Sequence, residues 1–500
     1  MTQIAGMKWL VVNPQGEIIE LPIKNSFVEW LRPIEYFISA HAWRKGKADT
    51  ALRTAESGYL TRKLCDASQE VIIREHDCGT DKYVVYSKQE SELRGDNFLN
   101  LIAGRVLAED ILDKKKNVVL SKDDLLDKEN IQLIQDMNIE EVKVRNPLVC
   151  HSISGICQKC YGTDLSTRRM VEIWVPVGII AAQSIGEPST QLTLSTFHEW
   201  WVAKWGDATT LGIDRVKQLF EVRDPKTPAI ITPFDGKVSF YETNKIRYVK
   251  VVSEYQKKTY LLKSGYKVDV KKWEEVKKWW IFASKGKSKL KIKEAGKVLE
   301  IKSDHIILGI QEEYIKSLTG LNAVKKDGEE VFKGEILTTW ALSIKEYKNV
   351  VGDLEAQKYI IRETKKVYGS QGQDLNDKHI EVVVKQLFSK VFIEDSGNSS
   401  FIPGTYVKYE EFIKVNKELE AEGRKAAKGK RLALGLTNIA KETDSWLSAA
   451  SFQETIRVMV ASSLKWSIDK LSDLKSNVII GRLLPVGEIY RKSHGIDIQE

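Results

Sequence analysis

The longest uninterrupted helix signal in this chain begins at Pro33. From there to about residue 69 the sequence contains no second proline, and Ala, Leu, Arg and Lys fill the interior. Proline is favoured in the first turn of a helix, and these four residues are favoured in its interior. The segment therefore predicts a single helix of about 35 residues, which would extend roughly 50 Å.

This predicted helix is unusually basic and keeps two glycines. Gly46 and Gly58 each cost about 1 kcal/mol relative to alanine inside a helix. A solvent-exposed helix that tolerates its glycines is one interpretation. The other is a helix that contacts nucleic acid and bends at the glycines. Its basic residues are Arg44, Lys45, Lys47, Arg53, Arg62 and Lys63.

Composition limits the class of protein. The chain has 500 residues, of which 42% are hydrophobic and 29% charged, a globular composition with room for several modules. No apolar run reaches the ~18–20 residues of a membrane span, and the first residues lack a signal-peptide pattern. The net charge of +8 fits a polyanionic partner without requiring one. Five cysteines, an odd number, favour a reducing cytoplasm over a disulfide framework.

Three cysteines form a compact metal-binding pattern. Cys150, Cys157 and Cys160 follow the spacing C-x6-C-x2-C, which lets two thiolates of a turn reach one tetrahedral Zn²⁺. Four thiolates would close the coordination shell and make the site structural, whereas three unlinked buried cysteines are the alternative. The candidates for the fourth ligand are Cys65, Cys78, His76 and His151. We favour Cys78, because a glycine follows it in a predicted turn.

The segment from residue 177 to residue 198 combines apolar and polar helix signals. Residues 177–184 predict an apolar helix, residues 186–188 (Gly-Glu-Pro) predict a break, and residues 189–198 predict a second short helix. A histidine beside a glutamine and a leucine can position a ligand such as a nucleotide, although a lone helical histidine is more often an ordinary hydrogen-bonded residue. The residues on one face of the second helix are Gln191, Leu194, Ser195 and His198.

The remaining sequence has a β-rich and a helical part. Residues 224–345 predict short strands between Lys-, Gly- and Asp-rich turns, typical of a β-sandwich insertion or a jaw-like module. Within this part, residues 270–283 resemble residues 324–337. Residues 423–436 form a dense basic run, for which a solvated face or a link is the usual explanation. Residues 438–471 have helical periodicity.

Several motifs, taken in order, resemble one family. "GIIAAQSIGEPSTQLTLSTFH" resembles the trigger-loop region of the β′ subunit of bacterial RNA polymerase, and "EYFISAHAWRKGKADTALRTAESGYLTRKL" resembles its bridge helix. "DCGT" with "VCHSISGICQKCYG" resembles its second zinc site, which supports Cys78 as the fourth ligand. The resemblance extends from about residue 4 to about residue 487 and is weakest across residues 235–345. The chain is therefore similar to the C-terminal half of that subunit.

The resemblance implies a multidomain α+β fold. Its expected parts are a long bridge-type helix, a zinc module, a helical-hairpin trigger loop, a small β-sandwich or barrel-like insertion, and a helical C-terminal region. In this context the basic run 423–436 is expected to contact a DNA backbone. The expected boundaries are 1–32 for the entry segment, 33–70 for the bridge helix, 71–170 for the zinc-binding module, 171–223 for the trigger loop and flanking helices, 224–345 for the β-rich jaw or insertion, and 346–500 for the C-terminal region of subunit packing and DNA contacts.

The resemblance also implies roles for single residues. When the matching nucleoside triphosphate binds, the trigger loop would fold against the bridge helix and bring Leu194 to the base, Gln191 to the ribose and His198 to the phosphates. There His198 would stabilise charge on the departing pyrophosphate or donate a proton to it. The residues expected beside the template are Thr54, Ala55 and Gly58, and those expected to bind nucleic acid are Arg44, Lys45, Arg53 and Arg62.

Metal ions and partners follow from the same resemblance. Structural Zn²⁺ would bind Cys78, Cys150, Cys157 and Cys160. The Mg²⁺ of the shared active site is held in the family by an Asp-rich signature of the DFDGD type, which this chain lacks, so the chain alone would be inactive. Its expected partners are the N-terminal β′ portion, the β, α and ω subunits, a sigma factor, template DNA, RNA and nucleoside triphosphates, without a membrane. The alternative is a stand-alone, non-catalytic zinc-containing factor that binds nucleic acid.

Tryptophan occurs where the family carries glycine. Ser195 also departs from the family, which has a basic residue there. We expect most tryptophans, Trp446 excepted, to stand for glycine, as they would if the source organism reads UGA as glycine and the gene was translated with UGA as tryptophan. Genuine aromatic substitution is the alternative. The tryptophans at glycine positions are Trp30, Trp174, Trp200 and Trp201. The internal repeat aligns Trp273 with Gly328 and Trp279 with Gly334.

Overall fold

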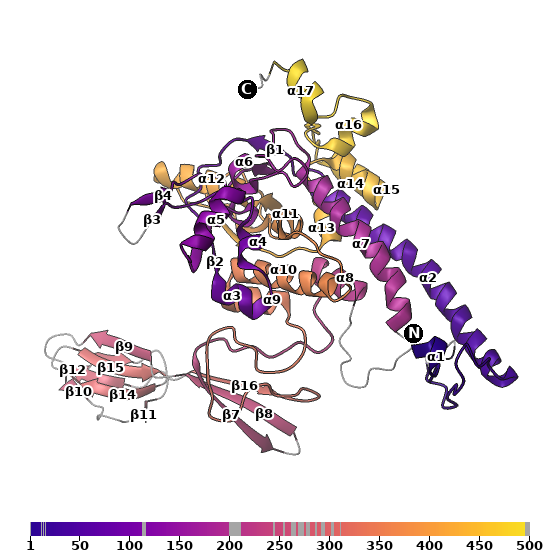
Figure 1. Ribbon diagram of the computed structural model, residues 1–500. Coiled ribbons are helices and arrows are strands. Elements are labelled where there is room, and N and C mark those ends of the chain that lie inside the picture. Colours follow the sequence, from indigo (N-terminus) through magenta and orange to yellow (C-terminus); the bar gives the residue numbers. More distant parts are fainter. Residues whose placement is uncertain are drawn as a thin grey trace. The chain divides into compact units, whose positions relative to one another are not determined.

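The computed structural model divides into two compact units, the first built from Met1–Arg223 with Leu354–Glu500 and the second from Asp224–Asp353 (Figure 1). None of its described helices is both long and apolar enough to cross a membrane. The structure describes residues 2–11, 13, 15, 17–112, 117–199, 212–243, 246–253, 256–261, 267–268, 275–276, 281–285, 288–291, 296–301, 305–310 and 312–495.

The helix expected from Pro33 is present as α2 (Pro33–Ser68). Its first turn is capped by Glu35, whose carboxylate accepts the backbone N–H of Arg32 at 2.9 Å and so satisfies a group that has no partner within the helix. Gly46 and Gly58 lie inside α2 without ending it. The apolar side chains that α2 buries are Ile38, Ala42, Leu60, Leu64 and Ala67.

A second long helix, α7 (Val177–Glu199), packs along α2 (Figure 1). The break expected at residues 186–188 is wrong, because the helix continues through Pro188. Proline lacks a backbone N–H and so removes one helical hydrogen bond, the one that would reach the carbonyl of Ser184. The packing of α7 against α2 stabilises the helix across that gap. The next helix, α8 (Ile213–Phe220), follows beyond residues that lie outside the described part.

Between α2 and α7 the chain forms a small module of short strands and helices. Strands β2 and β5 pair antiparallel, and β1 pairs parallel with β6. Its core is apolar and includes Ile102, Leu107 and Leu126, all fully buried. The strands are β1 (Ile73–Glu75), β2 (Val84–Ser87), β3 (Ile111–Leu112), β4 (Val118–Leu120), β5 (Glu141–Val144) and β6 (Ile156–Cys157). The helices are α3 (Lys88–Arg94), α4 (Phe98–Ile102), α5 (Lys128–Asp136), the 3-10 turn η1 (Pro147–Val149) and α6 (Gln158–Tyr161).

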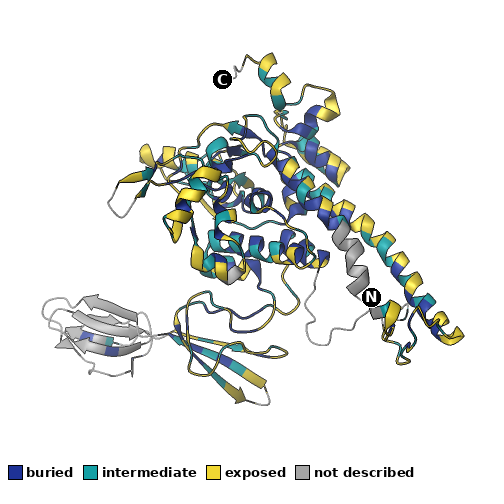
Figure 2. Ribbon diagram, in the orientation of Figure 1, coloured by how far each residue is buried: buried dark blue, intermediate teal, exposed yellow. Residues whose placement is uncertain are grey.

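The end of the first unit is largely helical. Helix α11 (Asp377–Leu387) is buried along most of its length and is largely dark blue in Figure 2, whereas α15 (Thr455–Leu464) and α17 (Gly487–Ser493) have no buried residues. Strand β18 (Lys390–Asp395) pairs with β19 (Tyr406–Lys408) and β20 (Lys428–Arg431), so part of the basic run forms an edge strand. The other helices of this part are α10 (Asp353–Gly369), α12 (Tyr409–Ala421), α13 (Leu436–Lys441), α14 (Trp446–Phe452), α15 (Thr455–Leu464), α16 (Leu474–Ile480) and α17 (Gly487–Ser493), and the short α1 (Thr2–Ala5) lies at the start of the unit.

The second unit is built mainly from antiparallel strands. One four-stranded sheet, in the order β16-β8-β7-β17, buries Val238, Val249 and Val251 on one face. Two further sheets have the orders β11-β14-β15-β9 and β10-β12-β13. The strands are β7 (Gly236–Thr243), β8 (Ile246–Ser253), β9 (Gln256–Leu261), β10 (Lys267–Val268), β11 (Glu275–Val276), β12 (Ile281–Lys285), β13 (Ser288–Lys291), β14 (Gly296–Ile301), β15 (His305–Ile310), β16 (Glu313–Ser317) and β17 (Glu330–Val331), and α9 (Ile344–Val351) follows them.

Tryptophans occupy backbone conformations that favour glycine. Eleven described non-glycine residues have positive φ, and five of them are tryptophans. A side chain at positive φ costs roughly 1–2 kcal/mol, which glycine avoids. Trp446, the excepted residue, begins α14 instead. These angles support the glycine hypothesis, and Gly328 and Gly334 of the internal repeat also have positive φ. The five tryptophans are Trp9, Trp30, Trp174, Trp340 and Trp466. Trp200, Trp201, Trp273 and Trp279 lie outside the described residues.

Candidate functional site

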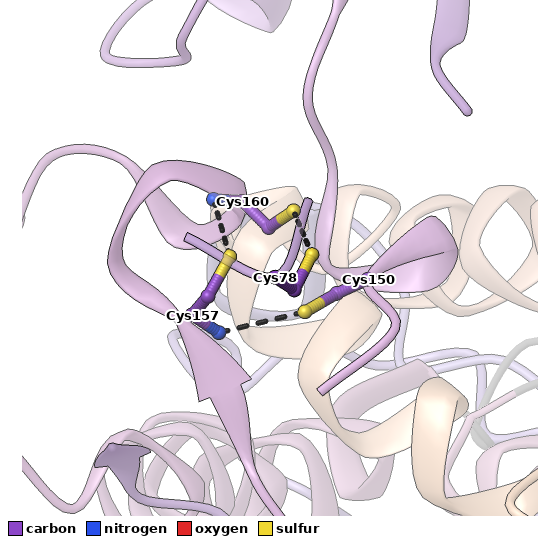
Figure 3. Close-up of side chains that lie close together, drawn as sticks. All are labelled: Cys78, Cys150, Cys157 and Cys160. Carbon is purple, nitrogen blue, oxygen red and sulfur yellow. Dashed lines mark hydrogen bonds between the residues drawn. The ribbon is translucent and has the colours of Figure 1, made fainter. Parts of the chain in front are cut away.

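Four cysteines from three stretches of the first unit converge on one point (Figure 3). Cys78 follows β1, Cys150 follows η1, and Cys157 and Cys160 lie where β6 passes into α6. All four sulfur atoms lie within 4.8 Å of one another, and those of Cys78 and Cys160 are 3.7 Å apart. Cys78 therefore joins the C-x6-C-x2-C group, as its place in a predicted turn had favoured.

The other candidates for a fourth ligand lie outside this cluster. Cys65 belongs to α2, and burial raises the pKa of its thiol. The Nδ1 atom of His76 lies 2.9 Å from Oε1 of Gln158. Within the described part of the chain, no other group of three or more His, Cys, Asp and Glu side chains is close enough to share one ion.

Tight backbone turns aim the cysteine sulfurs. The backbone N–H of Cys157 donates to Sγ of Cys150, and that of Cys160 donates to Sγ of Cys157, both at 3.4 Å (Figure 3). Gly155 precedes this turn at φ +89°, and a Cβ there would lie 2.0 Å from the carbonyl oxygen of Ile72. Only glycine meets both demands, so the turn fixes the position of the C-x2-C pair.

The donor set decides which ion fits. Four thiolates in a compact, mostly buried group match the tetrahedral sulfur coordination of structural zinc sites. Oxygen-seeking ions such as Mg²⁺ and Ca²⁺ are poor matches for sulfur ligands. Since the four thiolates would fill the coordination shell, the arrangement suits a structural role.

Three ionisable side chains of α11 attach the cysteine-bearing module to the centre of the unit. Lys378, Glu381 and Lys385 follow helical spacing and lie on one face. The Nζ atom of Lys378 donates to the backbone carbonyls of Gly104 and Thr163, both at 2.8 Å. The Nζ atom of Lys385 donates at 3.1 Å to a carbonyl of the turn before the C-x2-C pair. The position of the metal site therefore depends on α11.

Glu381 is the centre of a buried polar network. Its carboxylate accepts two hydrogen bonds from the guanidinium of Arg105, at 2.8 and 3.0 Å. It also accepts from Nδ2 of Asn146 at 2.9 Å and from the hydroxyl of Tyr86 at 3.1 Å. Burial acts to raise the pKa of Glu381, but Arg105 and these hydrogen bonds outweigh burial and lower it. The carboxylate is thus held in its charged form.

The sequence did not predict this network. The partners are far apart in the chain, and charge alone does not reveal burial. One local signal was present, because "DKHIEVVVKQL" places charged residues at helical spacing on an otherwise apolar helix.

Small and hydroxylated residues form the contact between α2 and α7. The hydroxyl oxygens of Ser57 and Thr190 lie 3.2 Å apart, within hydrogen-bonding distance. Gly186 faces Thr61, and a Cβ on Gly186 would lie 2.5 Å from that side chain. The two helices therefore approach more closely than larger side chains would allow.

A tyrosine of α10 holds α7 from another direction. The Tyr368 hydroxyl donates to the carbonyl of Ile185 at 3.0 Å and lies 2.6 Å from the hydroxyl of Ser189. Both Tyr368 and Ser189 are buried. These contacts adjoin Pro188, where the helix lacks a backbone donor, and they keep that stretch helical.

Comparison with known proteins identifies the family. The chain matches the family described as RNA polymerase Rpb1, domain 5, over residues 31–443. It is 41% identical over 489 residues to the DNA-directed RNA polymerase subunit beta′ of Caldanaerobacter subterraneus subsp. tengcongensis, covering 97% of this chain and 36% of that protein. The chain belongs to the RNA polymerase β′ family.

Other relatives of the β′ family give the same result. The β′ subunit of Natranaerobius thermophilus is 39% identical over 500 residues, covering 100% of this chain and 36% of that protein. The β′ subunit of Halalkalibacterium halodurans is 38% identical over 499 residues, covering 99% of this chain and 37% of that protein. The chain spans about a third of the length of the curated β′ relatives it matches.

The residues that the β′ resemblance places at the template lie on the exposed side of α2. Thr54, Ala55 and Gly58 are exposed, and a Cβ on Gly58 would meet nothing within 4 Å. Among the expected nucleic-acid contacts, Arg44 is exposed, whereas Lys45 and Arg53 are half-buried. Arg62 is exposed but donates to the backbone carbonyls of Ser451 and Phe452, both at 3.4 Å, so this side chain also joins α2 to the C-terminal helices.

The residues expected to meet the nucleotide lie on one helix of this β′ family member. Gln191, Leu194 and His198 all belong to α7, at helical spacing and on the same face of its backbone. Their side chains are outside the described part of the chain. Thr190, which precedes them, is the residue that contacts α2 through Ser57.

Proposed function

We propose that this chain is the C-terminal part of a β′ subunit and acts within DNA-directed RNA polymerase. In this proposal α2 is the bridge helix, and α7 with the residues after it is the trigger loop. The single observation that carries the proposal is the close packing of these two helices in a chain that matches the β′ family over residues 31–443. The expected domain boundaries and the cytoplasmic location belong to the same proposal.

The contact between α2 and α7 supports a hairpin that works against a fixed rod. Ser57 and Gly186 lie at this contact, and Tyr368 of α10 also anchors α7. Among the described side chains, the contact of Thr190 with Ser57 lies just before the residues with proposed roles at the nucleotide. A firmly held base is what a segment needs if it folds over a substrate and opens again after each addition.

The proposed chemistry assigns one task to each residue. Leu194 packs on the incoming base, Gln191 binds the ribose, and His198 lies at the phosphates. There His198 stabilises the negative charge that develops on the leaving pyrophosphate or donates a proton to it. Because the hairpin closes only on a matched nucleotide, closure adds selectivity to base pairing.

The bridge helix and the metal centre have supporting roles in the proposal. Thr54, Ala55 and Gly58 lie beside the templating base, and the basic side chains of α2 neutralise nucleic-acid phosphates. Zn²⁺ on the four cysteines would fix the module that α11 supports. When bound, Mg²⁺ would supply charge stabilisation for nucleotidyl transfer, and its ligands belong to an N-terminal β′ portion. The nucleic-acid residues are Arg44, Lys45, Arg53 and Arg62.

Single-nucleotide addition tests the proposal. The enzyme would be assembled from this chain, an N-terminal β′ portion with the Asp-rich motif, and the β, α and ω subunits. We expect His198→Ala to lower kcat by roughly 10²-fold, because it removes a group that acts in the transition state. His494→Ala is the control, since His494 is exposed beside α17. Wild-type kcat in the His198→Ala enzyme would contradict the proposed role.

A stand-alone zinc-containing factor is the competing function. Such a factor would bind nucleic acid without the other subunits and would not copurify with them. Co-expression with an N-terminal β′ portion and the β, α and ω subunits, followed by affinity purification of this chain, separates the two. Recovery of a stoichiometric complex supports the polymerase function, and recovery of the chain alone supports the factor.

A further inference from the structure

The guanidinium of Arg145 lies against the cysteine cluster. Arg145 directly follows β5, and its side chain is only 3% exposed. Its Nε atom lies 3.4 Å from Sγ of Cys160, and one terminal nitrogen lies 3.4 Å from the same sulfur. That nitrogen is also 3.5 Å from Sγ of Cys78 and 3.9 Å from Sγ of Cys157. One cation thus contacts three of the four sulfurs.

A buried guanidinium needs hydrogen-bond acceptors for its N–H groups and a negative charge nearby. The carboxylate of Asp77 accepts from Arg145 at 2.6 Å. Asp77 is a shared partner, because its second oxygen pairs with Lys159 at 3.0 Å. Burial works against the charged form of Asp77, but hydrogen bonds led by that of Arg145 lower its pKa to about 2. The carboxylate takes one hydrogen of this terminal nitrogen, so its second hydrogen and the Nε–H of Arg145 remain for the sulfur atoms.

The charge balance of a filled site explains the arrangement. Four thiolates around a dication carry a net charge of −2, which is costly to bury without compensation. Hydrogen bonds from a cation to thiolates disperse this charge and hold the sulfurs in place. We propose that Arg145 is a positioning residue for the metal ion, and that its guanidinium compensates the charge of the four-cysteine centre and slows the loss of the ion. This inference rests on the zinc site included in the proposed function.

The neighbouring residues Arg145 and Asn146 link the metal centre to α11. Arg145 faces the sulfurs, and the next residue, Asn146, donates to Glu381 at 2.9 Å. The backbone N–H of Arg145 donates to the carbonyl of Val106 at 2.8 Å and fixes the dipeptide between the two sites. A metal ion that orders Arg145 therefore also orders the attachment of the module to α11.

Transfer of zinc to a chelator tests the proposal. The full chain, loaded with Zn²⁺, would be mixed with pyridylazoresorcinol, and the rate of zinc release measured. We expect Arg145→Gln to release zinc roughly 10–100-fold faster, the usual effect of losing a partner of the metal ligands. Arg168→Gln is the matched control, since Arg168 is an exposed arginine of the same module. This control should release zinc at the wild-type rate.

A spectroscopic measurement separates positioning from general stability. In the Co²⁺-loaded chain, loss of hydrogen bonds to sulfur should shift the sulfur-to-cobalt charge-transfer band of Arg145→Gln and leave Arg168→Gln unchanged. Arg145→Lys keeps the charge with fewer donors, and we expect it to restore part of the slow release. If Arg145→Gln does not fold, Arg145→Lys tests the proposal instead. We expect this variant to release zinc a few-fold faster than the wild type and to show a shifted charge-transfer band.

The measurements distinguish failure of the Arg145 role from failure of the zinc site. Wild-type rates and bands in the Arg145 variants would overturn the role of Arg145 while leaving the zinc site intact. A wild-type chain that retains no zinc would overturn both the zinc site and this inference.

Discussion

Gly178 of α7 packs directly on the backbone carbonyl of Ser68 at the end of α2. A Cβ at residue 178 would lie 1.9 Å from the Ser68 carbonyl oxygen, closer than any real contact. The backbone N–H of Gly178 also donates to the carbonyl of Val71 at 3.0 Å, so the glycine cannot move away without losing a hydrogen bond. The two helices on which the proposed function depends meet at a point where only hydrogen fits.

Gly178→Ala should separate the ends of α2 and α7. The added methyl group meets backbone rather than a flexible side chain, so we expect a loss of about 3 kcal/mol in the free energy of unfolding. Gly58→Ala is the control, because a Cβ there meets nothing within 4 Å. Alanine favours the helix, and this control should gain about 1 kcal/mol. Urea denaturation followed by circular dichroism measures both, and equal stabilities would contradict the packing.

Glu381→Gln should destabilise the first unit strongly. Removing the carboxylate charge leaves the Arg105 guanidinium buried without its counter-ion, which costs about 3–5 kcal/mol. Glu109→Gln is the control, because Glu109 and Lys143 are also 2.8 Å apart but are both exposed. An exposed pair of this kind contributes less than about 1 kcal/mol. Similar urea midpoints for the two variants would show that the buried network is not a main source of stability.

Stability should rise with pH between about 7 and 10.5 because of Lys378. Burial, aided by the nearby Arg105 charge, lowers the pKa of Lys378 from 10.5 to about 7. In this window the unfolded chain binds a proton that the folded chain has released, so stability increases with pH. Below pH 7 both states are protonated and the full cost of burying the charge remains.

Lys378→Met should flatten this rise. The variant loses two hydrogen bonds at every pH, so the slope of the melting temperature with pH is the decisive quantity. Other groups titrate alike in both proteins and cancel in the comparison. Lys430→Met, which replaces an exposed lysine, should keep the wild-type slope. An unchanged slope in Lys378→Met would contradict the lowered pKa.

Replacing tryptophan with glycine should stabilise the chain where φ is positive. Trp466 has φ 51° and is 89% exposed, so its side chain has little packing to lose. We expect Trp466→Gly to raise the free energy of unfolding by about 1 kcal/mol, since glycine adopts this conformation without strain. Trp43→Gly is the control, because Trp43 is also exposed but lies inside α2, and glycine should cost about 0.5 kcal/mol there. In urea denaturation, we expect the two substitutions to change the free energy of unfolding in opposite directions.

Mass spectrometry of the protein from its source organism tests the cause of these tryptophans. We expect peptides that cover residues 200–201 and 279–280 to contain glycine. Tryptophan in those peptides would end the recoding hypothesis. The angles at Trp30 and Trp174 would then represent real strain in the folded chain.

The sequence was most informative where a signal is local or depends on spacing. Pro33 and a proline-free run predicted α2, and the spacing of Cys150, Cys157 and Cys160 predicted a shared site. Choosing Cys78 as the fourth ligand needed a turn signal and the family resemblance. Local signals failed at residues 186–188, where Gly-Glu-Pro predicted a break and the structure has a continuous helix.

The sequence by itself determined the long helix, the cysteine group and membership of the β′ family, because these are written in neighbouring residues and in ordered motifs. Only the tertiary structure decided which charges are buried and which glycines are indispensable. Arg105 and Glu381 are separated by 276 residues, and Gly178 meets a carbonyl more than a hundred residues away. The energy of such contacts depends on burial and on distances in space, and no local pattern contains either quantity.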